Sequence, residues 1–223
     1  MRQKVVLANL YAGLVTFILS WVLLIAGLPL AKTWFFCLAW WSLIVILDSL
    51  NFRIRGVSPL SESPSLFFSK ALFSTFVWLI FELFNLRMAN WAYHGLPAVR
   101  SLRWAGYFIA FASVIPALEE LALLAEPLFS GKLGLFRMKV KPFLLRTFAG
   151  LGLLCLVLVV IKPGIFFPLV WLGFIFLLEP LNYRLGHRSL LAELEKGEWQ
   201  TFWSWASAGL AAGFFWEFFN YGA

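Results

Sequence analysis

Two glutamates, each with an asparagine three residues later, lie inside strongly apolar runs and are the residues best placed to do chemistry. They are Glu82 with Asn85 and Glu217 with Asn220. A spacing of three residues puts each pair on one face of a helix. Because a charged side chain near the bilayer centre costs about 2.5–3.5 kcal/mol, such residues should face the protein interior. We therefore expect Glu82 and Glu217 to form a functional centre in the outer half of a membrane.

Three chemistries would use these carboxylates. A buried glutamate can keep its proton and act as a general acid toward an alkene or epoxide, while aromatic rings stabilise a carbocation. Carboxylate and amide oxygens also bind hard cations or a coupling proton. Third, Glu and Asn can simply hydrogen-bond between helices and lock them together.

A second duplicated motif precedes each of these pairs. It reads Asp48-Ser-Leu-Asn51-Phe-Arg53 in the first half and Glu179-Pro-Leu-Asn182-Tyr-Arg184 in the second. Each copy ends an apolar run, which predicts structural pairs or helix caps at the membrane interface. Two motifs repeated in the same order indicate one ancestral unit used twice.

The composition identifies the elements that must position these residues. The chain has 62% hydrophobic, 19% aromatic and only 13% charged residues, which predicts an integral membrane protein. A span needs roughly 20 apolar residues, and seven segments qualify, at about 5–30, 34–51, 67–93, 104–128, 143–161, 165–182 and 199–221. We predict a single all-α transmembrane domain with about seven transmembrane helices.

The charges predict an orientation. Thirteen of the 18 Lys and Arg residues fall on the side that carries the N-terminus, so that side is predicted to be cytoplasmic and the C-terminus to lie opposite. The membrane is expected to be a bacterial-type inner membrane. A basic cluster of Lys132, Arg137, Lys139 and Lys141 could attract anionic lipid heads.

The repeat predicts a parallel three-plus-one-plus-three arrangement of helices. Its units are about 5–95 and 143–223, joined by a linker helix at about 104–128. The second unit has four extra residues between its motifs, which fit a short interfacial helix in 190–198. In the last helix, Gly209 and Gly213 precede Glu217 at four-residue steps, which predicts a close neighbouring helix and a Glu217 packed against protein.

The linker helix carries Pro116-Ala-Leu-Glu119-Glu120. Adjacent residues of a helix point about 100° apart, so at most one of the two glutamates should join an interior site. This element, together with Trp78-Leu-Ile-Phe-Glu82 and the later Trp91, resembles the order of motifs in the heptahelical lycopene cyclase domains. The resemblance covers about 78–124, and Trp216-Glu217 echoes its start.

The resemblance implies proton-initiated cyclisation of an isoprenoid, carried by Glu82, Glu119 or Glu120, and Glu217. Trp78, Trp91, Asn85 and Asn220 are then candidate binding residues. The alternatives are a non-catalytic accessory or scaffold subunit of a larger membrane complex and, third, a cation- or proton-coupled transporter. We expect membrane lipids as partners, and no metal, cofactor or nucleic acid. An enzyme should have a lipid-accessible cavity near Glu82 and Glu217, and an accessory subunit a flat aromatic face.

Overall fold

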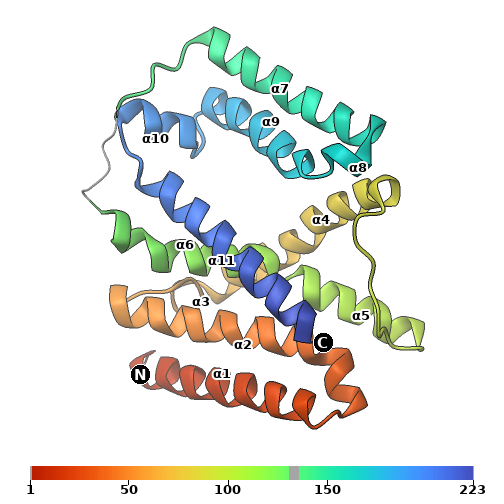
Figure 1. Cartoon of the computed structure of the whole chain (residues 1–223). Helices are drawn as coiled ribbons and strands as arrows, with labels where there is room; N and C mark the ends of the chain where they lie inside the picture. Colours follow the sequence, from red (N-terminus) through yellow and green to blue (C-terminus); the bar gives the residue numbers. More distant parts are fainter. Residues whose placement is uncertain (1, 131–135, 223) are drawn as a thin grey trace. The chain divides into compact units, whose positions relative to one another are not determined.

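The regular elements in the described part of the chain are all helices (Figure 1). The structure is a computed structural model, and it describes residues 2–130 and 136–222. No strand occurs in this part of the chain, so the prediction of an all-α protein is confirmed. Lys132 of the expected basic cluster lies outside the described residues.

The long helices follow the predicted segments closely. In chain order the elements are α1 (Arg2–Ile25), α2 (Pro29–Arg55), α3 (Pro59–Glu62), α4 (Pro64–Met88), α5 (Arg100–Phe111), α6 (Val114–Ala125), the 3₁₀ helix η1 (Glu126–Phe129), α7 (Pro142–Ile161), α8 (Pro163–Phe166), α9 (Leu169–Leu185), α10 (Leu190–Lys196) and α11 (Gln200–Gly222). The short helix predicted in 190–198 is present as α10. The linker helix is interrupted at Ala112–Ser113, between α5 and α6.

Within residues 2–130 and 136–222, five helical segments are long and apolar enough to cross a membrane: α1, α2, α4, the run Arg100–Phe129, and α7. The chain therefore has the character of a multi-pass membrane protein. Two predicted spans do not reach this standard. The segment 165–182 is divided between α8 and α9, and α9 has only 17 residues. The helix α11 has 23 residues, but its small and polar side chains lower its mean hydropathy.

The chain divides into two compact units, which we describe separately. The first unit contains Met1–Trp78, Tyr93–Leu128 and Ser204–Ala223. Its core is rich in aromatic rings, and Phe35 and Phe219 are fully buried. Phe219 of α11 packs edge-on against Trp40 of α2, with ring centroids 5.4 Å apart.

The second unit contains Leu79–Ala92 and Phe129–Trp203. Its core is built around Met88, Val159 and Val170, with Phe81 and Phe84 of α4 packed against it. The helix α4 therefore supplies its N-terminal part to the first unit and its C-terminal part to the second.

A glycine allows the closest helix approach in each unit. A Cβ at Gly13 of α1 would lie 3.0 Å from Ile46 and 3.2 Å from the Ser42 carbonyl on α2. A Cβ at Gly152 of α7 would lie 2.7 Å from Leu177 and 2.8 Å from the Gly173 carbonyl on α9. Ile46 and Leu177 each stand two residues before a motif carboxylate, Asp48 or Glu179. The closest approach thus has the same register in both helix pairs.

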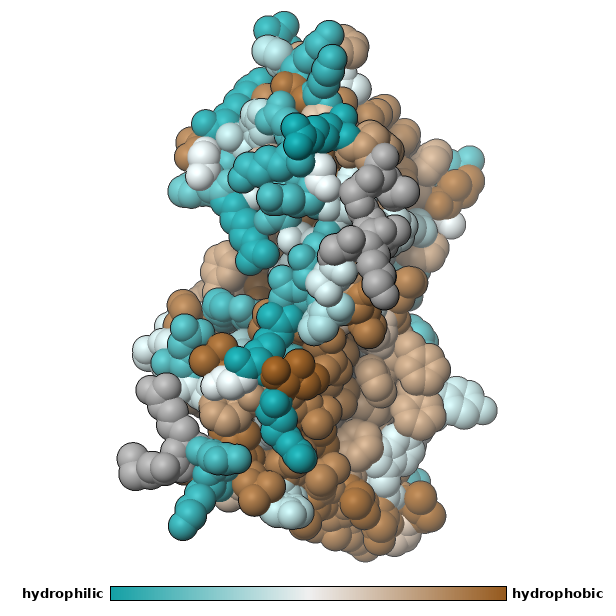
Figure 2. Space-filling model, turned by 90° about the vertical axis from the view of Figure 1, so that its left-hand side faces the viewer, coloured by the Kyte–Doolittle hydropathy of each residue, from teal (hydrophilic) through white to brown (hydrophobic). Residues whose placement is uncertain are grey.

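Left-handed glycines end the two motif-bearing helices. Gly56 follows α2 with φ 77°, and its N–H donates to the Phe52 carbonyl. Gly186 follows α9 with φ 68°. Glycine adopts this conformation without steric cost, so both helices stop here and the chain turns toward a short helix. Figure 2 views the side of Figure 1 on which α2 ends, and hydrophilic residues gather on this face beside broad hydrophobic flanks.

Candidate functional site

Three polar side chains form a buried centre in the first unit. Asp48 and Asn51 on α2 and Glu120 on α6 are 2%, 0% and 0% exposed. Asn51 Nδ2 donates to Glu120 Oε2 at 2.7 Å and to the Glu120 carbonyl at 2.9 Å. The carboxyl groups of Asp48 and Glu120 also lie close enough to interact. We call these three residues the buried centre.

Two ion pairs connect α6 to its neighbours beside the buried centre. Arg55 of α2 pairs with Glu126 at 2.6 Å and also donates to the Leu123 carbonyl. Lys70 of α4 pairs with Glu119. All four charged side chains are partly exposed, whereas Glu120 is fully buried. Glu119 and Glu120 therefore face different partners, as their adjacent positions on a helix require.

Asp48 caps the short helix that follows α2. Its Oδ1 accepts a hydrogen bond from the Leu60 N–H at 2.9 Å, while Ser58 accepts one from the Ser61 N–H. Asp48 lies seven residues before the end of α2, so it is deeper than the predicted interfacial position. Arg53 is exposed on the last turn of the same helix. The helix that Asp48 caps is α3, which follows its own helix in the chain.

Glu179 makes the same cap in the second unit. Its Oε2 accepts from the Leu191 N–H at 3.2 Å and from the Ser189 hydroxyl at 2.8 Å. Ser189 in turn accepts from the Ala192 N–H. Arg184 is exposed, like Arg53, and Asn182 is half-buried.

The serines of these caps were not predicted. Ser58 follows Asp48 by ten residues, and Ser189 follows Glu179 by ten. The capped N–H groups, at Leu60 and Leu191, both lie twelve residues after the carboxylate. The equal spacing from carboxylate to serine is visible in the sequence of both units, but the predicted motifs ended at Arg53 and Arg184 and so did not include the serines.

Glu82 and Asn85 hold the turn that follows α4. Glu82 accepts a hydrogen bond from Trp91 Nε1 at 3.0 Å. Asn85 accepts from the N–H groups of Asn90 and Trp91 and donates to the Trp91 carbonyl at 2.9 Å. The turn includes Ala89 with φ 49°, a costly conformation for alanine. These side chains have a structural task in the second unit.

Glu217 and Asn220 are exposed on α11 in the first unit. A Cβ built at Gly209 or Gly213 would meet no described atom within 4 Å. The prediction that these glycines admit a close helix and that Glu217 packs against protein is therefore wrong for the described part of the chain. Glu82 and Glu217 also belong to different compact units.

Trp78 belongs to the aromatic core of the first unit. Its ring lies 5.1 Å from that of Trp216 and 6.0 Å from that of Phe111, between centroids. Its Nε1 donates to the Tyr93 hydroxyl at 3.4 Å. Trp91, by contrast, lies in the second unit, near Trp171.

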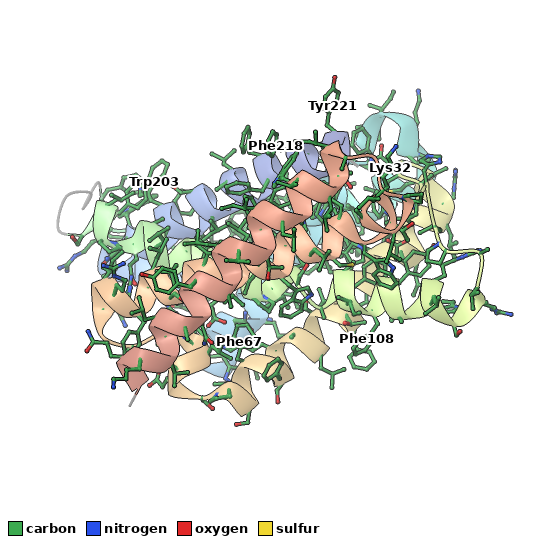
Figure 3. The ribbon with its side chains drawn as sticks, turned by 90° about the horizontal axis from the view of Figure 1, so that it is seen from below. Lys32, Phe67, Phe108, Trp203, Phe218 and Tyr221 are labelled. Atoms are coloured by element: carbon green, nitrogen blue, oxygen red, sulfur yellow. The ribbon has the colours of Figure 1, made fainter. Side chains whose placement is uncertain are left out.

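Two open apolar grooves lie on the first unit. The first, of about 520 Å³, is lined by Trp41, Phe68, Ala71, Leu72, Phe108, Ile109 and Ala112. The second, of about 470 Å³, shares Trp41 and Ile109 with it. Trp41 Nε1 donates to the Ile109 carbonyl at 2.9 Å, which fixes the indole between the grooves. Figure 3 shows Phe108 directed away from the neighbouring helices at the edge of the unit. Neither groove is lined by Glu82 or Glu217.

Among the described residues, no three His, Cys, Asp or Glu side chains come together as a metal site would require. Comparisons with protein-family models, curated proteins and solved structures give no match. The resemblance to lycopene cyclases stays a prediction, and function must be argued from the geometry.

Proposed function

We propose that the chain is an integral membrane enzyme that acts on an isoprenoid or another lipid by proton-initiated chemistry. The observation that supports this best is the first groove, which is lined by apolar side chains. Lys70, paired with Glu119, directly precedes Ala71 of the groove wall. An apolar chain would lie in the groove, and its polar head would meet Lys70 and Glu119. In this proposal Glu119 replaces Glu82 and Glu217 as the reacting acid. Its carboxylate takes a proton from the ammonium group of its partner Lys70, which leaves both side chains neutral, and then delivers that proton to the substrate.

The groove offers what a carbocation would need. Its helices α2, α4 and α5 belong to segments long enough to cross a membrane, so hydrocarbon is the natural occupant. Trp41, Phe68 and Phe108 supply aromatic faces, which attract cations by about 0.5–2 kcal/mol each. Glu119 is 22% exposed and so is more accessible than the fully buried Glu120.

We further propose that the fold is a parallel duplication with a three-plus-one-plus-three order. The pairs α1–α2 and α7–α9 would correspond, as would α3 and α10, and α4 and α11. The matched carboxylate caps of Asp48 and Glu179 support this correspondence. The matched registers of Gly13 and Gly152 extend this correspondence to the first helix of each repeat unit, α1 and α7, where we find no shared sequence motif. The orientation with a cytoplasmic N-terminus is part of the same proposal.

Blocking the groove tests the function. Leu72 is 46% exposed, so Leu72→Trp should fill the groove without disturbing the core. In membranes given photoreactive prenyl and acyl lipids, we expect this variant to lose labelling at least about tenfold, equivalent to 1.4 kcal/mol of binding. Val15→Trp is the matched control, because Val15 is 62% exposed and lines neither groove.

A second variant separates binding from chemistry. Glu119→Gln removes the acid and leaves the apolar wall intact, so labelling should persist while product, measured by mass spectrometry, disappears. Equal labelling of Leu72→Trp and the wild type would overturn the groove as substrate site. Product formation at the wild-type rate by Glu119→Gln would overturn the acid assignment.

The accessory-subunit alternative is supported by one surface. Phe214 and Phe218 of α11 stack at 5.9 Å and are 64% and 46% exposed, and Tyr221 is 96% exposed. Figure 3 shows Phe218 and Tyr221 pointing outward from α11. A photo-crosslinking residue at Phe218 should then give one discrete adduct in native membranes, and the same residue at Val15 should give none. Diffuse lipid adducts at both positions would exclude this alternative.

A further inference from the structure

The buried centre contains two oxygen atoms that have no hydrogen-bond partner among the described residues. They are Asn51 Oδ1 and Glu120 Oε1, on side chains that are both 0% exposed. Buried side-chain oxygens almost always have a partner, so a pair of unsatisfied ones requires an explanation.

The orientation of the Asn51 amide is fixed by its bonds. Its Nδ2 contacts the Glu120 carbonyl, which can only accept a hydrogen bond, so a donor must stand at that position. The same Nδ2 donates to Glu120 Oε2. The two oxygens without a partner are therefore Asn51 Oδ1, in the same amide as Nδ2, and Glu120 Oε1, in the same carboxyl group as Oε2. The amide and the carboxyl group are already joined by one hydrogen bond.

We propose that the buried centre is a proton-binding site, in which Glu120 carries the proton on Oε1 and donates it to Asn51 Oδ1. One proton then satisfies both unpartnered oxygens. The amide N–H donates to one carboxyl oxygen while the carboxyl O–H donates to the amide oxygen, which closes a ring of two hydrogen bonds. This is the ordinary pairing of a carboxylic acid with an amide.

The surrounding charges favour this arrangement. Asp48 of α2 lies close to Glu120, and two ionised carboxylates side by side would repel in an apolar interior. From α3, the Leu60 N–H donates to Asp48 Oδ1 at 2.9 Å. The nearby cations are already engaged, Arg55 with Glu126 and Lys70 of α4 with Glu119.

Loss of the proton would act on helix packing. An ionised Glu120 would place two negative charges between α2 and α6 and break the bond to Asn51 Oδ1. Proton binding should therefore stabilise the α2–α6 contact, and release should loosen it. The three residues of the buried centre do not line the lipid groove. A failed lipid-labelling experiment at the groove would therefore not contradict the proton-binding site.

Infrared spectroscopy of the full chain in lipid nanodiscs tests the site. A protonated carboxyl group has a C=O band distinct from that of a carboxylate. We expect such a band at neutral pH in the wild type and its loss in Glu120→Gln. The glutamine amide of that variant can form the same two-bond ring with Asn51, so the fold should persist. Glu217→Gln is the matched control, because Glu217 is exposed, and it should keep the band.

The melting temperature gives a second readout. If the folded state holds a proton that the unfolded state releases, stability must fall as the pH rises. We expect this alkaline fall in the wild type and in Glu217→Gln, and its loss in Glu120→Gln. An unchanged carboxyl band in Glu120→Gln would overturn the proposal. Stabilisation by Na⁺ without a carboxyl band in the wild type would also overturn it, because a metal cation would then occupy the oxygens.

Discussion

The regions α2–α3 and α9–α10 share a local design but differ in what covers them. Asp48 and Glu179 cap their short helices through N–H groups at the same distance along the chain. Asn51 is buried against Glu120 of α6, whereas the corresponding Asn182 is half-buried. Residues close in the chain are thus enough to form the cap in both copies. The buried polar centre forms only at Asn51, because α6, which is distant in the chain, brings Glu120 to it.

Replacing the two asparagines should give the largest difference in the free energy of unfolding between the two copies of the motif. Asn51→Leu would leave Glu120 Oε2 and the proposed Glu120 O–H unpartnered in the interior, at about 1–3 kcal/mol each, so we expect a loss of roughly 2–6 kcal/mol. Asn182→Leu should change the free energy of unfolding by less than about 0.5 kcal/mol. Equilibrium unfolding in detergent measures both, and equal losses would contradict the distinction.

The glycines give the next largest difference. Gly152→Ala would place a Cβ 2.8 Å from the Gly173 carbonyl, so the backbones of α7 and α9 must separate. We expect a loss of about 1–3 kcal/mol, typical of overpacking. Gly13→Ala meets Ile46 Cγ1 at 3.0 Å and the Ser42 carbonyl at 3.2 Å, which are longer contacts than those at Gly152, so it should cost less. Melting temperatures of the two variants would test this order. A higher melting temperature for Gly152→Ala than for Gly13→Ala would contradict it.

Removing the capping serines should reduce stability less than replacing Asn51 or Gly152 does. The loss should be greater for Ser189 in the second unit than for Ser58 in the first. Ser189→Ala loses both the cap of α10 and the hydrogen bond to Glu179, and about 1–2 kcal/mol is expected. Ser58→Ala loses the cap of α3 alone, at about 1 kcal/mol. Hydrogen exchange of the amides at Ser61 and Ala192 would show whether each short helix frays. Protection unchanged in both variants would argue against the shared cap.

The smallest effect is expected at the exposed ion pair of α10. Arg188 is 76% exposed and contacts Glu193 at 3.4 Å. Exposed pairs contribute about 0–1 kcal/mol, so Arg188→Ala should lower stability by no more than about 0.5 kcal/mol. Its unfolding should also respond little to salt. A larger loss would mean that Arg188 has a further partner in the membrane-bound protein.

The helices were predictable because apolar length is a local property. The predicted 34–51 and 143–161 lie within α2 and α7, and the helix inserted in 190–198 is α10. The break between α5 and α6 was not predicted, although Pro116 marks it: the proline nitrogen cannot donate to the carbonyl four residues earlier, that of Ala112.

The site was harder to predict because its partners come from distant parts of the chain. Glu120 meets Asn51 across 69 residues, and Lys70 meets Glu119 across 49. Glu82, expected in a functional centre, contacts Trp91 only nine residues away. Glu217 was assigned to the interior on the cost of burying charge, but that cost does not say which face of α11 is covered.

The multi-pass membrane character and most of the helical segments follow from composition, and the carboxylate caps join residues only twelve positions apart. Packing between distant helices is what makes the carboxylate and asparagine of one copy of the motif fully buried and leaves those of the other half-buried. Asp48 and Glu179 have equivalent neighbours along the chain, yet α6 packs on α2 and brings Glu120 to Asn51. Such a pairing depends on the register between helices, and no local spacing encodes it.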